Sequence, residues 1–239
     1  MRMLLAVALT AASSWATAQP SPPSPPRPAT IQVTGQAQVS EAPDRVYIDI
    51  GVTTQAQKSE AAASQNAKRL TEVIAALKRA AGPGAQLTTT QYSVSPNYTY
   101  PRGGTPTVAG YTASNVVRIR LDDLGRIGRV IDAATEAGSN NIQDIRFALR
   151  DEQGPRGEAL REAARNARQD ADALADALGL RIVRVSTVSE QSPGAGPVPV
   201  YARAMSVAEA PAVRTPVEAG TIDINATVTL TVEVAPVKR

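Results

Sequence analysis

The stretch "TIDINATVTLTVEV", Thr221 to Val234, decides the fold class, because its apolar and polar residues alternate without a break. At about 3.3 Å per residue, an extended chain of this length would reach roughly 45 Å. A strand so long and so one-sided belongs to a sheet that is covered on one face and wet on the other, as in antiparallel or mixed α+β folds. The apolar face consists of Ile222, Ile224, Ala226, Val228, Leu230, Val232 and Val234.

Alternating segments elsewhere predict further strands. In residues 31–39 and 46–52 every second residue is apolar, and the intervening "SEAPDR" suits a turn between two neighbouring strands. Residues 87–100 and 109–123 predict two strands joined by "PRGGTP". Residues 141–150, with Ile145, Phe147 and Leu149 pointing inward, and residues 181–190 predict two more, followed by a long Pro/Ala loop from Ser192 to Pro216.

Three segments instead show the period of an amphipathic helix. The first ends in Lys78 and Arg79 before Gly82, the second can be capped by Asp122 or Asp123, and the third ends at Gly179. The apolar faces expected of the three helices are Leu70, Val73, Ile74 and Leu77; Leu124, Ile127, Ile131 and Ala134; and Leu160, Ala164, Ala167, Ala171, Leu174 and Leu178. The predicted fold is therefore α+β, with mixed, largely antiparallel long-stranded sheets packed with three amphipathic helices.

The N-terminal residues 1–18 have the order of a secretory signal: Arg2, a short apolar core, and "ATA" ending at Ala18. The apolar core is about half the ~20 residues needed to span a bilayer, so a membrane anchor is the weaker interpretation. Residues 19–29 are Pro-rich and predict an extended linker. We expect cleavage after Ala18, a folded domain over residues 30–239, a periplasmic location and no transmembrane segment in the mature chain.

Few residues are available for chemistry near neutral pH, because the chain contains neither His nor Cys. Ser catalysis usually needs a His base, and neither S-x-x-K nor G-x-S-x-G occurs. The acidic pairs Asp122 with Asp123 and Asp172 with Asp176 are interpreted as a helix cap and a solvated helix face, with acid–base chemistry as the alternative. Zinc and copper would lack their usual ligands. The sequence therefore predicts no catalytic residue, no cofactor and no metal.

Charge and aromatic content argue against a nucleic-acid partner. The chain has 25 Lys and Arg against 22 Asp and Glu residues, one Trp and one Phe. Arg161, Arg165 and Arg168 lie three or four positions from acidic residues, so we interpret this helix face as ion-paired. A small positive balance without a stacking platform is not typical of a nucleic-acid-binding surface.

Several segments in order resemble the SIMPL-domain family, which includes periplasmic immunogenic and oxidative-stress-defence proteins of Gram-negative bacteria. They are "IQVTGQAQVSEAPDRVYIDIGVTTQAQ", "QYSVSPNYTYP", "GYTASNVVRIRLDDLGRIGRVIDAATEAGSNNIQDIRFALRD", "ALREAARNARQDADALADALGL" and "TPVEAGTIDINATVTLTVEV". The resemblance covers nearly all of the mature chain. It implies an exported α+β protein, often oligomeric, with no established activity and no catalytic residues to carry over, and it makes Asp44 and Arg45 turn and strand-start residues.

Two functions remain open at this stage. The first is a non-catalytic envelope protein that acts as a homo-oligomeric assembly in stress defence, with any other protein partner unknown. The second is a periplasmic binding module that holds a small molecule or peptide in a cleft between helices and sheet. For an assembly, Tyr98 and Tyr100 beside the Gly-Gly tip are candidate contacts, because Tyr suits partner surfaces; a solvated loop with incidental tyrosines is the alternative.

Overall fold

The computed structural model describes residues 28–191, 198–200 and 218–237. The expected signal segment, most of the linker and most of the loop from Ser192 to Pro216 lie outside these residues. The elements are β1 (Thr30–Glu41), β2 (Arg45–Ala56), α1 (Ser59–Ala81), β3 (Gln86–Thr99), β4 (Thr107–Leu121), η1 (Leu124–Arg126), α2 (Ile127–Glu136), β5 (Asn141–Ala148), α3 (Gln153–Ala177), β6 (Leu180–Gln191), β7 (Val198–Val200) and β8 (Thr221–Pro236).

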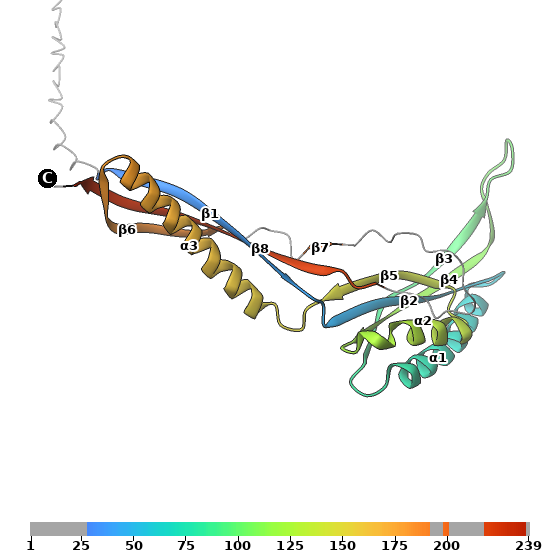
Figure 1. Cartoon of the computed structure of the whole chain (residues 1–239). Helices are drawn as coiled ribbons and strands as arrows, with labels where there is room; N and C mark the ends of the chain where they lie inside the picture. Colours follow the sequence, from blue (N-terminus) through green and yellow to red (C-terminus); the bar gives the residue numbers. More distant parts are fainter. Residues whose placement is uncertain (1–27, 192–197, 201–217, 238–239) are drawn as a thin grey trace, which may run out of the picture.

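The strands form two separate antiparallel sheets, which confirms the α+β class. One sheet has the order β1-β8-β6, with β7 paired to the start of β8, and α3 packs on it; we call this the single-helix unit. The other has the order β3-β4-β2-β5, with α1 and α2 packed on it; we call this the two-helix unit. The units lie end to end and give an elongated molecule (Figure 1).

The prediction that the first two strands are neighbours is wrong. Strand β1 pairs with β8, whereas β2 pairs with β4 and β5 in the other sheet. The link between them is instead hydrogen-bonded to the end of β5 and the residues that follow it. Asp44 N donates to Ala148 O at 3.3 Å, and Asp44 Oδ1 accepts from Arg150 N at 2.7 Å. Pro and Asp favour a change of chain direction, but they do not determine which strand the next segment joins.

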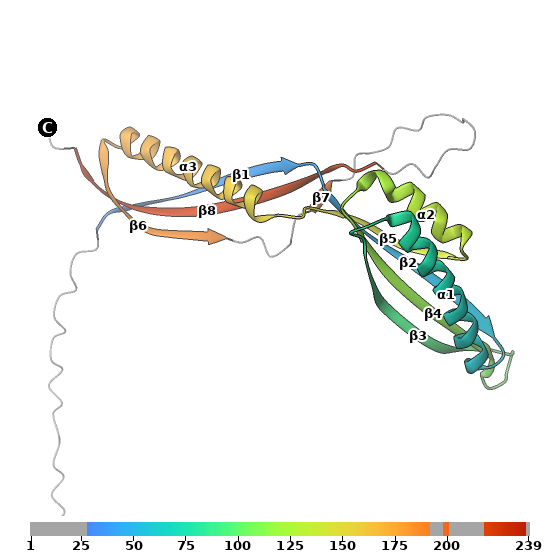
Figure 2. The same cartoon turned by 90° about the horizontal axis from the view of Figure 1, so that it is seen from below.

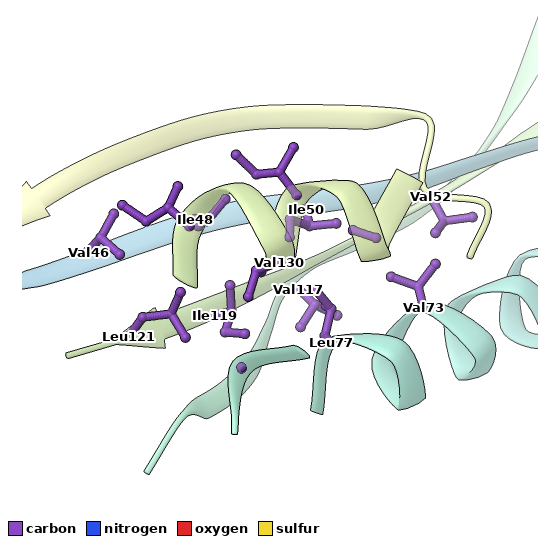
Figure 3. Close-up of a cluster of buried hydrophobic side chains, with 14 of the residues drawn as sticks. Val46, Ile48, Ile50, Val52, Val73, Leu77, Val117, Ile119, Leu121 and Val130 are labelled. Atoms are coloured by element: carbon purple, nitrogen blue, oxygen red, sulfur yellow. The ribbon is translucent and has the colours of Figure 1, made fainter. Parts of the chain in front are cut away.

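The two-helix unit has the β-α-β-β-α-β order of a split βαβ fold. Both helices cover the same face of the sheet, and large aliphatic side chains from strands and helices fill the space between them (Figure 3). The strand face expected from period two is confirmed, as is the helix face built on Leu70, Val73 and Leu77. The fully enclosed residues of this core include Val46, Ile48, Ile50, Val52, Val73, Leu77, Ile119 and Val130.

The single-helix unit is built on β8, whose predicted apolar face is buried from Ile222 to Val234. Helix α3 packs on this face much more closely than α1 or α2 pack on their sheet. A Cβ added to Gly35 of β1 would lie 2.1 Å from Ala163 O and 2.3 Å from Ala167 N. Glycine therefore lets the helix backbone approach β1 directly.

This close approach corrects the face predicted for the third helix. Its buried residues follow a strict interval of four: Ala159, Ala163, Ala167, Ala171 and Ala175. Leu174 and Leu178, which were expected inside, are 45% and 64% exposed. Methyl groups are the largest side chains that fit at this separation, so the alanines rather than the leucines face the sheet.

One short strand lies within the stretch predicted to be a loop. Strand β7 pairs antiparallel with β8, with Val198 opposite Asp223 and Val200 opposite Thr221. Figure 1 shows β7 beside the start of β8, between the two units. A segment this short has too few residues for an alternation to be recognised in the sequence.

Candidate functional site

The candidate contact residues lie on a hairpin formed by β3 and β4, which projects from the two-helix unit (Figure 1). The hairpin is closed by the predicted Pro- and Gly-rich turn: Gly104 N donates to Pro101 O at 3.1 Å, and Gly103 has a φ of 76°. Below the turn, Asn97 and Thr112 exchange side-chain hydrogen bonds of 2.8 and 3.0 Å. These contacts connect the two strands where they leave the sheet.

Tyr98 and Tyr100 both lie exposed at the end of this hairpin. Their exposed fractions are 52% and 75%, and Tyr98 stands opposite Val108, which is 50% exposed. Strand β3 ends at Thr99, so strand alternation does not extend to Tyr100. The register also shifts between Asn97 and Tyr98. The structure therefore places Tyr98 opposite Val108 and leaves Tyr98, Tyr100 and Val108 exposed at the end of the hairpin, without placing Tyr98 and Tyr100 on one strand face.

Val108 is a residue that the sequence reasoning missed. A signal for it existed, because Val108 comes directly after the Pro- and Gly-rich turn, where a hairpin has no helix to cover its side chains. Tyr92, farther down β3 and 58% exposed, was also missed. It stands opposite Asn115 in the register, well away from the turn.

The acidic pair that follows β4 is fully engaged in structural contacts. Asp122 receives hydrogen bonds from Arg45 Nε at 2.7 Å and Arg45 Nη2 at 3.0 Å, and these lower the pKa of Asp122. Asp123 accepts from Arg126 Nε at 2.8 Å and from Gly125 N at 3.1 Å; the Arg126 contact is the main cause that lowers the pKa of Asp123. Asp123 is the cap of η1, as predicted, whereas Asp122 is an ion-pair partner. Carboxyl groups held ionised in this way do not suit a general acid.

Two ion pairs form on the face of α3 that has alternating charges. Arg168 Nε lies 3.0 Å from Asp172 Oδ2, and Arg165 Nη1 lies 2.7 Å from Glu162 Oε2. Both pairs lie within one turn of α3, which is the arrangement expected for a solvated helix surface. Asp172 therefore has an arginine as its partner.

A hollow of about 500 Å³ lies between α1 and α2. Its lining comes from the helices alone, namely Ala76, Arg79, Ala80, Ala133, Glu136 and Ala137. The binding-module hypothesis expected a cleft between helices and sheet, but that space is filled by the aliphatic core (Figure 3). Within the described ranges, no group of three or more Asp and Glu residues could hold a metal ion, and no helix is long and apolar enough to cross a membrane.

A buried polar contact fixes α1 to the sheet, and sequence reasoning missed it. Asn66 is fully buried, and its Nδ2 donates to Val52 O at 2.7 Å and to Ala113 O at 3.0 Å. Thr54 Oγ1 donates to Ala62 O at 2.8 Å. These bonds join the first half of α1 to β2 and β4 and thereby hold the sheet from which the hairpin projects.

Comparison with known proteins finds sequence matches that extend over both units. The family profile described as "SIMPL: Protein of unknown function (DUF541)" matches residues 31–232, which span both units. The 26 kDa periplasmic immunogenic protein of Brucella melitensis is 30% identical over 215 residues, covering 87% of this chain and 86% of that protein.

More distant relatives are described only as uncharacterised. The protein YggE of Edwardsiella ictaluri is 26% identical over 188 residues, covering 77% of this chain and 79% of its own. YggE of Escherichia coli K12 is 25% identical over 158 residues, covering 66% and 64%. The profile match across both sheets and the similarity to the Brucella protein lead to one conclusion, that this chain is a member of the SIMPL family.

Proposed function

We propose that this protein is a non-catalytic envelope protein of the periplasm that works as a homo-oligomeric assembly in stress defence. The name of the Brucella relative supports the periplasmic location, and the predicted signal segment agrees with it. Of the four carboxylates that sequence reasoning considered for acid–base work, Asp122, Asp123 and Asp172 have arginine partners, and Asp176 lies exposed on α3. A non-catalytic protein would act through the surface that it presents.

The observation that carries the proposal is the exposed hairpin end with Tyr98, Tyr100 and Val108. Tyr is enriched at protein interfaces because its ring covers apolar area while its hydroxyl group remains hydrogen-bonded. The chain has six Tyr and only one Phe, so two tyrosines in one hairpin end are a considerable share of its aromatic residues. Because the hairpin extends beyond the helices, it can reach a neighbouring subunit (Figure 1).

The test is the double variant Tyr98→Ser with Tyr100→Ser, compared with Tyr92→Ser. Tyr92 lies on the same strand and is as exposed as Tyr98, but it lies away from the turn. We expect the double variant to lower the native mass measured by light scattering at low micromolar concentration, while Tyr92→Ser leaves it unchanged. Both should keep the far-UV circular dichroism and the unfolding midpoint, since exposed residues contribute little to stability. A double variant with the wild-type mass would exclude the hairpin as an interface.

The hollow between α1 and α2 supports a second candidate function, a periplasmic binding module. Alanine methyl groups line it together with one Arg and one Glu, which suits a small zwitterionic compound or a peptide end. A binding module would be a monomer or dimer whose unfolding midpoint rises with ligand concentration, whereas an assembly has a large native mass without ligand.

A further inference from the structure

The face of the two-helix sheet that points away from α1 and α2 carries a row of polar residues. Both helices lie on one side of this sheet (Figure 1, Figure 2), and Val46 and Ile48 of β2 point toward them. Tyr47 lies between these two residues in the strand and therefore points to the other face. Residues directly opposite each other on antiparallel strands share a face. The register thus gives one row across β3, β4, β2 and β5, made of Gln86, Arg120, Tyr47 and Arg146.

The positive group of Arg146 extends along this row toward Arg120. Its guanidinium carbon, Cζ, lies 5.7 Å from the centre of the Tyr47 ring, where a cation is attracted by the electrons of the ring. Because neighbouring strands are about 4.8 Å apart, a side chain of β5 that reaches this ring extends over β2. Strand β4 is the next strand of the sheet, and Arg120 stands on it directly opposite Tyr47. The surface around the Tyr47 ring is therefore bordered by two arginines.

Two carboxylates near this row are held by other arginines. Asp49, in the next row, accepts hydrogen bonds from Arg118 Nε and Arg118 Nη2, both at 2.7 Å. Asp122, which follows β4, accepts two hydrogen bonds from Arg45. The bonds from Arg45 are the main cause that lowers the pKa of Asp122, and Arg120 contributes to it only through its charge. Neither carboxylate is left to pair with Arg120.

A third carboxylate on this face belongs to Asp144, which is exposed and stands opposite Asp49. The hydrogen bonds to Asp49 are the main cause that raises the pKa of Arg118, and the charge of Asp144 adds to this effect. Asp144 therefore acts on the row of Arg118. Within the described residues, neither Arg120 nor Arg146 takes part in an ion pair.

Arg120 also has a buried donor without an acceptor. Its Nε atom is shielded from solvent and has no hydrogen-bond partner among the residues that the structure describes. A buried donor without a partner destabilises a fold, and the cost is larger for a charged group. Two positive side chains on one sheet face also repel each other. An anion bound beside Arg120 and Arg146 would offset both effects, because it attracts both charges and accepts hydrogen bonds from guanidinium groups.

The geometry of arginine determines the chemical class of this anion. A guanidinium group can donate two parallel hydrogen bonds to a carboxylate or a phosphate, and Arg118 does so with Asp49 on the same face. We propose that Arg120 and Arg146, on either side of Tyr47, form a binding site for an oxyanion, the carboxylate or phosphate group of a small ligand. The site lies on a different surface from the hairpin end and from the hollow between α1 and α2, so it does not depend on the proposed assembly.

The first experiment measures the binding of two probe anions, inorganic phosphate and succinate, to the full mature chain. The phosphorus NMR line of phosphate and the proton NMR line of succinate broaden on binding, because a bound anion tumbles as slowly as the protein. A constant ionic strength of about 0.15 M limits weak attraction by distant charges. We expect at least one probe to show saturable binding with a dissociation constant of about 1 mM. Because the anion is observed, the mass of an assembly does not prevent the measurement.

The second experiment removes the two arginines. Arg120→Gln with Arg146→Gln should weaken binding of the probe by about tenfold or more, as expected for the loss of charge-assisted hydrogen bonds. The matched control is Arg69→Gln with Arg102→Gln, which removes the same charge from exposed residues of α1 and the hairpin turn. The control should bind like the wild type. Arg146→Gln alone should also weaken binding without disturbing the fold, since Arg146 is exposed.

The outcomes separate an oxyanion site from its alternatives. Binding of both probes supports the site, and binding of only one identifies its ligand group as phosphate or carboxylate. Absence of saturable binding for both probes overturns the inference. Equal weakening in the control variant also overturns it, because the attraction would then come from the overall positive charge. If circular dichroism shows that the double variant does not fold, unchanged binding by Arg146→Gln overturns the site. A monomeric wild type that binds a probe would exclude the assembly and still support this site.

Discussion

In the two-helix unit, α1 and α2 press Leu, Val and Ile side chains against four strands, whereas in the single-helix unit α3 places a row of alanines against β1 and β8. The first arrangement leaves Ile48, Ile50 and Val52 without exposed surface. The second brings backbone close to backbone at Gly35 and leaves β6 partly uncovered. One unit thus derives its stability from the volume of buried side chains, and the other from the closeness of its helix.

This difference assigns the units different roles. A wide core encloses its own apolar surface and can support a projecting element such as the β3–β4 hairpin. The narrow core under one helix does not cover every strand of its sheet, so Val183, Val185 and Val188 of β6 remain exposed. Substitutions that leave a cavity should therefore destabilise the two-helix unit more, whereas substitutions that overpack the core should destabilise the single-helix unit more.

Truncation of a large side chain gives the largest expected effect. Ile48→Ala should lower the free energy of unfolding by about 4 kcal/mol, because the lost methylene groups leave a cavity in a densely packed core. Ile224→Ala in the single-helix unit should cost about 2 kcal/mol, since its site is 7% exposed and less enclosed. Urea unfolding followed by circular dichroism measures both, and hydrogen exchange shows which unit opens. Equal losses of unfolding free energy in the two variants would contradict the proposed difference between the two cores.

Addition of one methyl group should destabilise the single-helix unit more than the two-helix unit, which reverses the order expected for truncation. Gly35→Ala would place its Cβ 2.1 Å from Ala163 O, so α3 must move, and we expect a loss of about 3 kcal/mol. Gly51→Ala is the matched control in the two-helix unit, where the nearest atom would be Asn141 O at 3.2 Å. This variant should cost less than about 1 kcal/mol, because the neighbouring chain has to move by only a few tenths of an ångström. A Gly35→Ala protein as stable as the wild type would exclude the close approach of α3.

The sequence predicted the helices and strands of both units better than it predicted which strands pair with each other. Alternation in β8 and the helical period around Leu70 and Val73 follow from burial on one face, which is a local property of the chain. The placement of β1 and β2 in different sheets depends on long-range pairing, which the residues of the link do not encode. The alanine face of α3 was predicted only in part: Ala167 and Ala171 were placed on it, and the alanine stripe indicated close approach to a sheet or another helix. Leu174 and Leu178 were wrongly added because a hydrophobic pattern favours leucine, whereas close packing on Gly35 selects the smallest side chain.

The candidate site was predictable only in part. The composition of the chain made Tyr98 and Tyr100 conspicuous beside a Gly-Gly turn, and the structure places both on an exposed hairpin. The exposed valines of β6 could not be found in the same way, since Val183, Val185 and Val188 have the composition of an ordinary buried strand. Their exposure results from where α3 crosses the sheet, which only the three-dimensional arrangement reveals.

The smallest expected effect concerns the join between the units, where Arg45 and Arg150 both approach Asp122. The hydrogen bonds from Arg45 lower the pKa of Asp122 in the folded protein below its value of about 3.9 in the unfolded chain. A carboxyl group with a lowered folded pKa stabilises the fold above the unfolded pKa, and this contribution is lost as the pH falls through the folded pKa.

Asp122→Asn should therefore lower the free energy of unfolding by up to about 1 kcal/mol at pH 7, as expected for a partly exposed ion pair. The difference between variant and wild type should shrink below about pH 4, which urea unfolding at pH 7, 5 and 3 would measure. An unchanged difference at pH 3 would show that Asp122 acts through its shape and hydrogen bonds rather than through its charge. The double variant with Arg45→Gln distinguishes these causes, because a charge interaction predicts that the second substitution adds little to the first.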